Sequence, residues 1–177
     1  DRPYVPGTPL GGSSPNAPDG GTRHAWDLVF FAETLAARTD FDVFRGDRSA
    51  FVAEFGCLGP SDAATIRSFL PPGEGRGGPS WRYHDNWFED GATAYTIERY
   101  WGPVGDLDLE GYAALGQHFQ GAALALAITH WRQRKYRTAG AITWGYLDLW
   151  GTTHSWSLVD VHLRRRASYH AVARACA

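Results

Sequence analysis

The sequence lacks the features that mark several specialised classes of protein. Its 177 residues include only two cysteines, Cys57 and Cys176, which form neither a disulfide framework nor the closely spaced pair of a zinc site. We expect Cys57 to pack as a small apolar residue. No apolar run reaches the roughly 20 residues that a membrane-spanning helix needs. We therefore expect no membrane partner.

An excess of charge of either sign is also missing. The formal net charge is −2, so general affinity for polyanions is not expected, and we predict no nucleic-acid partner. One basic cluster, HLRRR at 162–166, is short, and we interpret it as a solvated turn. The first residues, DRPYVPGTPLGG, lack the basic start and apolar stretch of a secretory signal. The compartment stays open.

Several motifs of catalysis and cofactor binding are absent too. No Gly-x-Gly-x-x-Gly or phosphate-loop pattern occurs. The seven histidines form no closely spaced pair backed by carboxylates, so we predict no zinc or iron site. Ser155 and Ser157 lack the glycine elbow of a serine hydrolase.

What the sequence does contain is a globular amount of apolar residues and many aromatic ones. Hydrophobic residues make up 44% of the chain, which at this length is enough for one domain with a real core. Aromatic residues reach 14%, with eight tryptophans. The tryptophans fit either a large core or a pocket with flat aromatic walls for sugars, and composition leaves both interpretations open.

Strand and helix patterns alternate along the chain. We predict an extended segment at 2–9, a strand or strand end at 24–31, a strand at 51–56, and a buried strand that runs out into a loop at 139–151. We also predict partly helical spacing at 33–45, a loop at 72–90, and helices at 61–71, 91–102, 109–134 and 165–177. Because the 139–151 run lacks clean alternation, we expect a strand covered on both faces. The alternation predicts an α/β fold with parallel pairing. In barrels of this kind, catalytic residues lie where the strands end.

The strand FVAEFG at 51–56 contains a carboxylate where burial would exclude one. An unpaired buried charge is costly, so Glu54 needs a reason to be there. One interpretation is a catalytic carboxylate at a strand end; the other is an ion pair with Arg45 or Arg48. Gly56 favours a close backbone approach just after it.

These segments together resemble β-mannosidases of glycoside hydrolase family 2. The match runs in order through RPYVPGTP, HAWDLVF, FVAEFG with TIRSFLP, HFQGAALALAITHWRQRKYRTAGAITWGYLDLW, SWSLVD and RRASYHAVA. This collinear order covers nearly the whole chain and is more specific than any single motif. It implies a (β/α)8 barrel glycosidase, of which the chain would be the C-terminal half, about strands 5–8 with their helices.

The resemblance also implies roles for individual residues. Glu54 would be the catalytic nucleophile of a retaining, exo-acting β-mannosidase, and Trp144 the platform beneath the sugar. His24, Trp26, Asp148 and Trp150 would contribute to substrate binding. The implied partner is a carbohydrate substrate, and the implied chemistry needs neither a metal nor an organic cofactor.

Two departures from the family pattern widen the alternatives. Gly145 and Leu147 replace an amide pair in WGYLDLW, so β-galactosidase, β-glucuronidase and exo-β-glucosaminidase types stay open. The family's acid/base follows an asparagine, and no Asn-Glu pair occurs in the chain. We therefore expect 1–177 to be part of a catalytic domain, inactive alone. The acid/base strand and the N-terminal β-sandwich domains of the parent enzyme would lie outside it. A non-catalytic carbohydrate-binding remnant and a purely structural remnant are the other interpretations.

Overall fold

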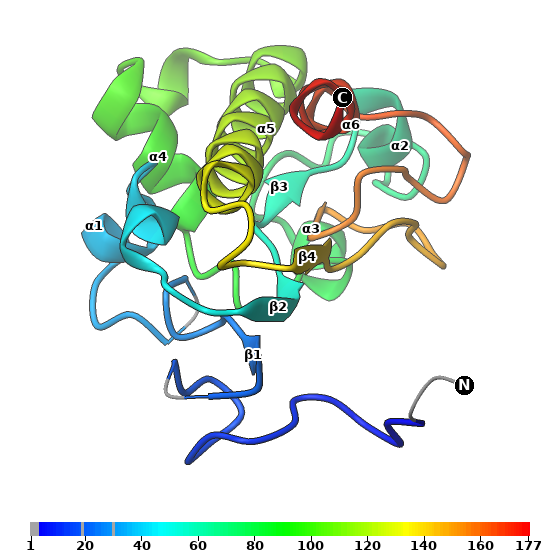
Figure 1. The fold of residues 1–177 in the computed structure, drawn as a ribbon. Helices are drawn as coiled ribbons and strands as arrows, with labels where there is room; N and C mark the ends of the chain where they lie inside the picture. Colours follow the sequence, from blue (N-terminus) through cyan, green and yellow to red (C-terminus); the bar gives the residue numbers. More distant parts are fainter. Residues whose placement is uncertain (1–3, 19, 30) are drawn as a thin grey trace.

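A computed structural model describes residues 4–18, 20–29 and 31–177 of the chain. Three strands form a parallel sheet in the order β1 (Thr22–His24), β2 (Phe51–Phe55) and β4 (Gly140–Thr143). The long connection from β2 to β4 carries most of the helices, as parallel pairing requires. Figure 1 shows the longest of these helices, α5 (Leu109–Gln133), on one side of the strands. The expected α/β arrangement with parallel pairing is confirmed.

Six α-helices and two short 3₁₀ helices are found in the described residues. They are α1 (Leu35–Arg38), η1 (Val43–Gly46), α2 (Ala63–Arg67), α3 (Pro79–Tyr83), α4 (Ala92–Tyr100), η2 (Val104–Asp106), α5 (Leu109–Gln133) and α6 (Ala167–Cys176). A small antiparallel pair, β3 (Gly59–Pro60) with β5 (His154–Ser155), follows the ends of β2 and β4. The predicted helices at 61–71, 91–102, 109–134 and 165–177 are all present, and their ends differ by a few residues.

The core lies between the sheet and α5. Phe55 of β2 has no exposed surface, and its ring lies 4.6 Å from that of Trp131 on α5 and 5.8 Å from that of Phe44. Burying such a side chain contributes roughly 1.5–3 kcal/mol. Cys57 packs in the same cluster, as expected. Burial, with a smaller contribution from the charge of Glu89, raises the pKa of its thiol to about 12, so the thiol is unreactive near neutral pH.

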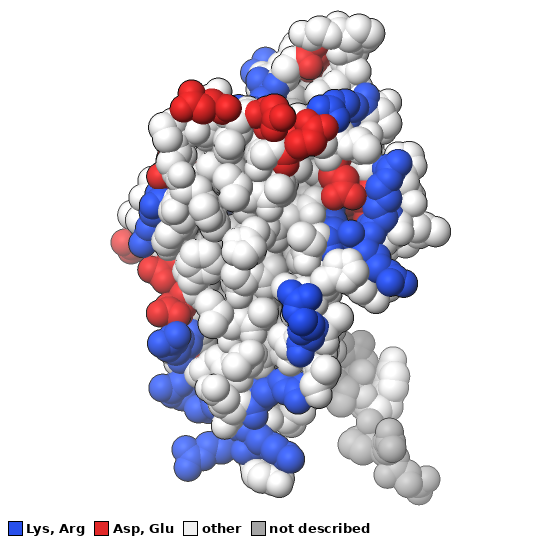
Figure 2. Space-filling view, turned by 90° about the horizontal axis from the view of Figure 1, so that it is seen from above, with Lys and Arg blue, Asp and Glu red and all other residues white. Residues whose placement is uncertain are grey.

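The helix α5 carries acidic residues at its start and basic residues at its end. Asp108 caps its N-terminus by accepting a hydrogen bond from the N–H of Gly111 at 2.7 Å, and Glu110 lies in the first turn. Arg132 lies in the last turn. These charges oppose the helix dipole and stabilise both ends. Figure 2 shows most of the acidic side chains in the upper part of the view, basic ones at the bottom, charges of both signs along the two sides, and a largely uncharged centre.

Two of the predicted strands differ from the observed ones. Of the strand or strand end predicted at 24–31, only His24 belongs to β1, and turns follow it; residue 30 lies outside the described residues. The strand predicted to run out into a loop within 139–151 is β4, but it is not buried as expected, because Ile142 within it is 54% exposed. The apolar run correctly predicted a strand. In the described sheet, however, β4 is an edge strand that pairs with β2. The extended segment expected at 2–9 begins in the undescribed residues 1–3, and 4–9 form no strand.

Two predictions about polar segments were also wrong. The loop expected at 72–90 contains α3, which begins with Pro79. The backbone N–H groups of Ser80 and Trp81, in its first turn, donate hydrogen bonds to the side chain of Glu74 at 2.6 and 3.0 Å. The cluster HLRRR was expected to be a solvated turn. Residues 162–165 are exposed, but Arg166 is fully buried, because it pairs with a buried carboxylate.

Candidate active site

The parallel sheet brings the predicted site residues to one edge. The register pairs His24 at the end of β1 with Glu54 in β2, and Phe55 with Thr143 at the end of β4. Parallel strands place their carboxyl ends at the same edge, where side chains from separate segments meet. A register irregularity next to His24 and another around Glu54 occur at this edge. Such irregularities redirect side chains near functional sites.

Glu54 is held by the two aromatic residues at the end of β1. The indole Nε1–H of Trp26 donates to Oε2 of Glu54 at 3.0 Å, and Nδ1 of His24 lies 3.3 Å from the same oxygen. The side chain of Glu54 is 25% exposed. Arg45 instead pairs with Asp42, and Arg48 donates to backbone carbonyls. Neither arginine forms the ion pair that was the alternative explanation of Glu54.

Gly56 is the point at which three tryptophans converge. A Cβ placed there would lie 2.5 Å from the carbonyl oxygen of Trp144 and 3.0 Å from ring atoms of Trp26 and Trp156. The N–H of Trp144 donates to the carbonyl of Phe55 at 2.7 Å. Only glycine fits between these groups, as the close approach expected from the sequence requires. Trp144 is thereby fixed beside the end of the strand that carries Glu54.

The other three predicted residues line a pocket of about 300 Å³. Trp144, Asp148 and Trp150 all contribute to its wall, and both tryptophans are about half exposed. The ring of Trp150 stacks on His84 at 4.7 Å, and Phe69 stacks on His84 at 4.0 Å. A flat, partly exposed aromatic ring is a suitable surface for a sugar.

One side chain links the pocket to the Glu54 cluster. Trp156 lines the pocket, and its ring centroid lies 6.2 Å from that of Trp26. The structure thus brings His24, Trp26 and Glu54 into direct contact, and it places Trp144, Asp148 and Trp150 around the adjoining pocket.

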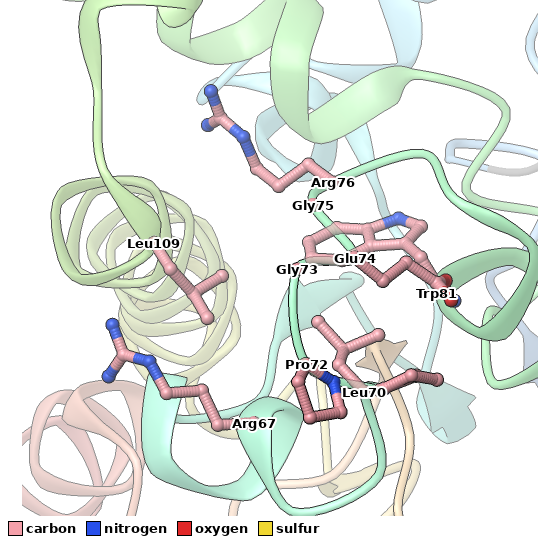
Figure 3. A pocket seen from close by; sticks show the side chains of 10 residues that line it. Arg67, Leu70, Pro72, Gly73, Glu74, Gly75, Arg76, Trp81 and Leu109 are labelled. Atoms are coloured by element: carbon pink, nitrogen blue, oxygen red, sulfur yellow. Dashed lines mark hydrogen bonds between the residues drawn. The ribbon is translucent and has the colours of Figure 1, made fainter.

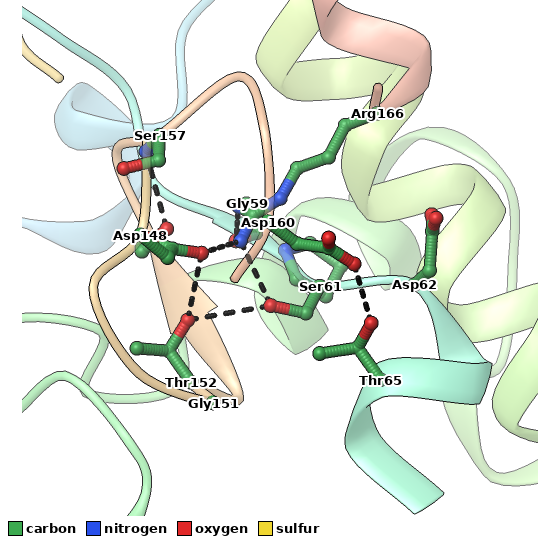
Figure 4. A network of polar contacts seen from close by, with 12 residues as sticks. Gly59, Ser61, Asp62, Thr65, Asp148, Gly151, Thr152, Ser157, Asp160 and Arg166 are labelled. Carbon is green, nitrogen blue, oxygen red and sulfur yellow. Dashed lines mark hydrogen bonds and ion pairs between the residues drawn. The ribbon is translucent and has the colours of Figure 1, made fainter. Parts of the chain in front are cut away.

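Asp148 forms part of a buried polar network, shown in Figure 4. The Nη2 of Arg166 donates to its Oδ2, and Thr152 donates to the same oxygen at 3.2 Å. Arg166 also donates to Ser61 at 2.8 Å and to the carbonyl of Gly59 at 3.2 Å. Burial lowers the pKa of Arg166, and the charge of Asp148 opposes that effect. Asp148 therefore lines the pocket and, through Arg166, also connects the pocket wall to the segment of Gly59 and Ser61.

A second buried chain of polar groups behind the pocket was not predicted. Nδ1 of His154 lies 2.6 Å from Asp85, and its Nε2 lies 2.8 Å from the hydroxyl of Tyr112. Asp85 and His154 both line the pocket. Burial opposes protonation of His154, but Glu89 and Asp85 outweigh it, so its pKa is raised. These residues come from segments about 70 positions apart with no shared motif, and sequence reasoning had no signal for them.

The raised pKa of His154 predicts a pH-dependent stability. Folding favours the protonated form of His154. Its contribution to the free energy of unfolding is therefore fully present below pH 6.5, the ordinary pKa, and is lost as the pH rises through the higher pKa of the folded state. The free energy of unfolding, measured in urea from pH 5.5 to 9, should fall more steeply in the wild type than in His154→Gln. His162→Gln, at an exposed histidine, is the matched control. Equal slopes in all three proteins would contradict this explanation.

Another cavity, of about 560 Å³, lies between α2, the 71–78 loop and the start of α5 (Figure 3). Its lining includes Arg67, Glu74, Arg76, Trp81 and Leu109, and none of the predicted site residues. Arg67 is paired with Glu110, and Glu74 caps α3.

Across the described ranges, no three His, Cys, Asp or Glu side chains gather as metal ligands would. None of the described helices combines the length and apolarity needed to cross a membrane.

The fold matches that of a glycosidase. A solved structure titled Beta-D-Mannosidase, from Dictyoglomus thermophilum, superposes with a TM-score of 0.84 and 32% sequence identity, over 98% of this chain and 21% of that one. At this identity the likeness extends beyond the fold to the sequence.

The curated relatives agree. Proteins named Beta-mannosidase B are 31% identical in Thermothelomyces thermophilus and 29% identical in Aspergillus niger, each over 97% of this chain. The chain spans about one fifth of their length, 21% and 20% respectively. No protein-family model matches the chain. The resemblance to β-mannosidases of glycoside hydrolase family 2 is confirmed, and the chain is β-mannosidase-like over nearly its whole length.

Proposed function

We propose that the chain supplies the nucleophile side of a retaining, exo-acting β-glycosidase whose substrate is a terminal β-linked mannoside. The observation that carries this proposal is the placement of Glu54. It lies at the carboxyl end of a parallel strand, held by His24 and Trp26, with Trp144 fixed beside it. The similarity to proteins named β-mannosidase supports mannose as the sugar.

In the proposed reaction, Glu54 attacks the anomeric carbon of the sugar. A bond forms between a carboxylate oxygen and that carbon while the bond to the leaving oxygen breaks. A general acid protonates the departing oxygen. Water then hydrolyses the glycosyl ester, with the acid now acting as base. A fixed carboxylate also stabilises the positive charge that develops at the sugar carbon. The substrate-binding residues would be His24, Trp26, Trp144, Asp148 and Trp150.

The general acid is assigned to no residue of this chain. Glu89 accepts two hydrogen bonds from Thr93, Glu110 pairs with Arg67, and Glu74 caps α3. Glu33 and Glu98 are exposed. We propose that the acid belongs to a part of the longer enzyme outside 1–177. The three parallel strands would then be neighbouring strands of a (β/α)8 barrel, and 1–177 would be part of one catalytic domain.

Covalent trapping with activated 2-fluoro glycosides tests the proposal. Dinitrophenolate leaves without protonation, so the missing acid is not required, and the fluorine slows hydrolysis of the ester. The 177-residue chain is incubated with dinitrophenyl 2-deoxy-2-fluoro-β-mannoside and, in parallel, with the corresponding glucoside and galactoside. Intact-mass spectrometry should show one adduct, formed fastest with the mannoside. Faster labelling by another sugar would reassign the substrate. A folded chain that binds mannosides without any adduct would be a binding module.

A further inference from the structure

His24 and Trp26 both contact the same oxygen of Glu54. The indole N–H of Trp26 lies 3.0 Å from Oε2 and Nδ1 of His24 lies 3.3 Å from it. One hydrogen-bond donor, the indole of Trp26, and one ring nitrogen, Nδ1 of His24, therefore orient the carboxylate of Glu54 from one short segment.

His24 and Trp26 are themselves held in place. The backbone N–H of His24 donates to the carbonyl of Pro15 at 3.0 Å, and that of Ala25 donates to the carbonyl of Glu54 at 2.8 Å. The second bond ties the end of β1 to the residue whose side chain it orients. The indole of Trp26 packs near Gly56 and Trp156, so its ring is confined. Such support is what a preorganised catalytic group requires.

We infer that Trp26 and His24 are positioning residues for the nucleophile, which hold Oε2 of Glu54 so that Oε1 makes the bond to the anomeric carbon. The inference rests on the proposed function and changes one part of it, because both residues were expected to bind the sugar. The reacting pair is then Oε1 and the sugar carbon. When Oε1 bonds to that carbon, the bond from the carbon to the leaving oxygen breaks. The leaving group, dinitrophenolate in the trapping experiment, takes the electron pair of that bond, and Oε2 becomes the carbonyl oxygen of the ester. The indole N–H of Trp26 can donate to Oε2 before and after this step.

The variants separate the hydrogen bond from the packing. Trp26→Phe keeps an aromatic ring beside Trp156 but removes the donor. His24→Leu removes the ring nitrogen beside Oε2, and His24→Asn restores a polar nitrogen near the position of Nδ1. Trp101→Phe is the matched control, since Trp101 is 41% exposed at the end of α4 and contacts Tyr100 and His118. Near-ultraviolet circular dichroism checks that each variant is folded.

The measurement is the rate of adduct formation with the dinitrophenyl 2-fluoro mannoside, as a function of glycoside concentration. Trp26→Phe and His24→Leu should lower the maximal rate about tenfold or more, with little change in the glycoside concentration for half-maximal labelling. His24→Asn should recover part of the rate, and Trp101→Phe should match the wild type.

The outcomes distinguish the inference from the function on which it rests. If the variants change only the glycoside concentration for half-maximal labelling, with the maximal rate unchanged, the residues bind sugar and the inference is wrong. Wild-type rates in both Trp26→Phe and His24→Leu would overturn it equally. If the folded wild type forms no adduct at any concentration, the proposed function itself fails.

Discussion

Glu54→Gln is expected to lose covalent labelling by the activated 2-fluoro mannoside, with a fall in rate of at least about a thousandfold. Glutamine has nearly the same size and can still accept the N–H of Trp26 through its amide oxygen. It lacks the negative charge that attacks the anomeric carbon in the proposed reaction. The variant should therefore keep the fold while losing the reaction. Intact-mass time courses of the two proteins under identical conditions measure the difference.

Two comparisons make this result specific to Glu54. Glu98→Gln, at an exposed carboxylate of α4, should label like the wild type. Glu54→Gly with added azide should release a glycosyl azide of inverted configuration, because the small anion replaces the missing carboxylate on the same face of the sugar. Undiminished labelling of Glu54→Gln would show that another group reacts.

Replacing Arg166 with methionine is expected to cost about 3–5 kcal/mol of unfolding free energy. Methionine fills much of the space but leaves the buried carboxylate of Asp148 without its cation, and Ser61 and the carbonyl of Gly59 without a donor. A domain of this size has only about 5–15 kcal/mol of stability, so the loss is a large fraction. Urea unfolding followed by tryptophan fluorescence measures it.

The controls for Arg166 lie next to it in sequence and space. Arg165→Met, at an exposed neighbour, should change the free energy of unfolding by less than about 0.5 kcal/mol. The double variant Arg166→Met with Asp148→Asn should be more stable than Arg166→Met alone, since no unpaired charge is then buried. If Arg166→Met costs less than about 1 kcal/mol, the network in Figure 4 is not the support described here.

The sequence identified the features that depend on local pattern. A carboxylate within an apolar strand and a glycine two residues later were readable in FVAEFG, and the structure explains the glycine by the close approach of Trp144. The length and apolar spacing of α5 predicted that helix almost to its ends. The collinear motifs predicted the family resemblance, because order and spacing survive where single residues change.

The features that depend on distant partners could not be read in this way. Arg166 looked solvated within its basic run, because its carboxylate partner lies 18 residues away in another loop. His154 was not predicted, because its partner Asp85 is 69 residues away. The face of β4 looked buried because apolar content predicts a strand but does not show what covers it; Ile142 is half exposed. The helix α3 was hidden in a Pro- and Gly-rich segment and depends on Glu74 for its cap.

Peptide mapping of the trapped chain is the most direct test of how the site is assigned. After incubation with the dinitrophenyl 2-fluoro mannoside, the chain is digested, and tandem mass spectrometry locates the sugar. We predict a single ester on the side chain of Glu54. A sugar attached to Asp85 or Asp148, with Glu54 unmodified, would contradict the central claim.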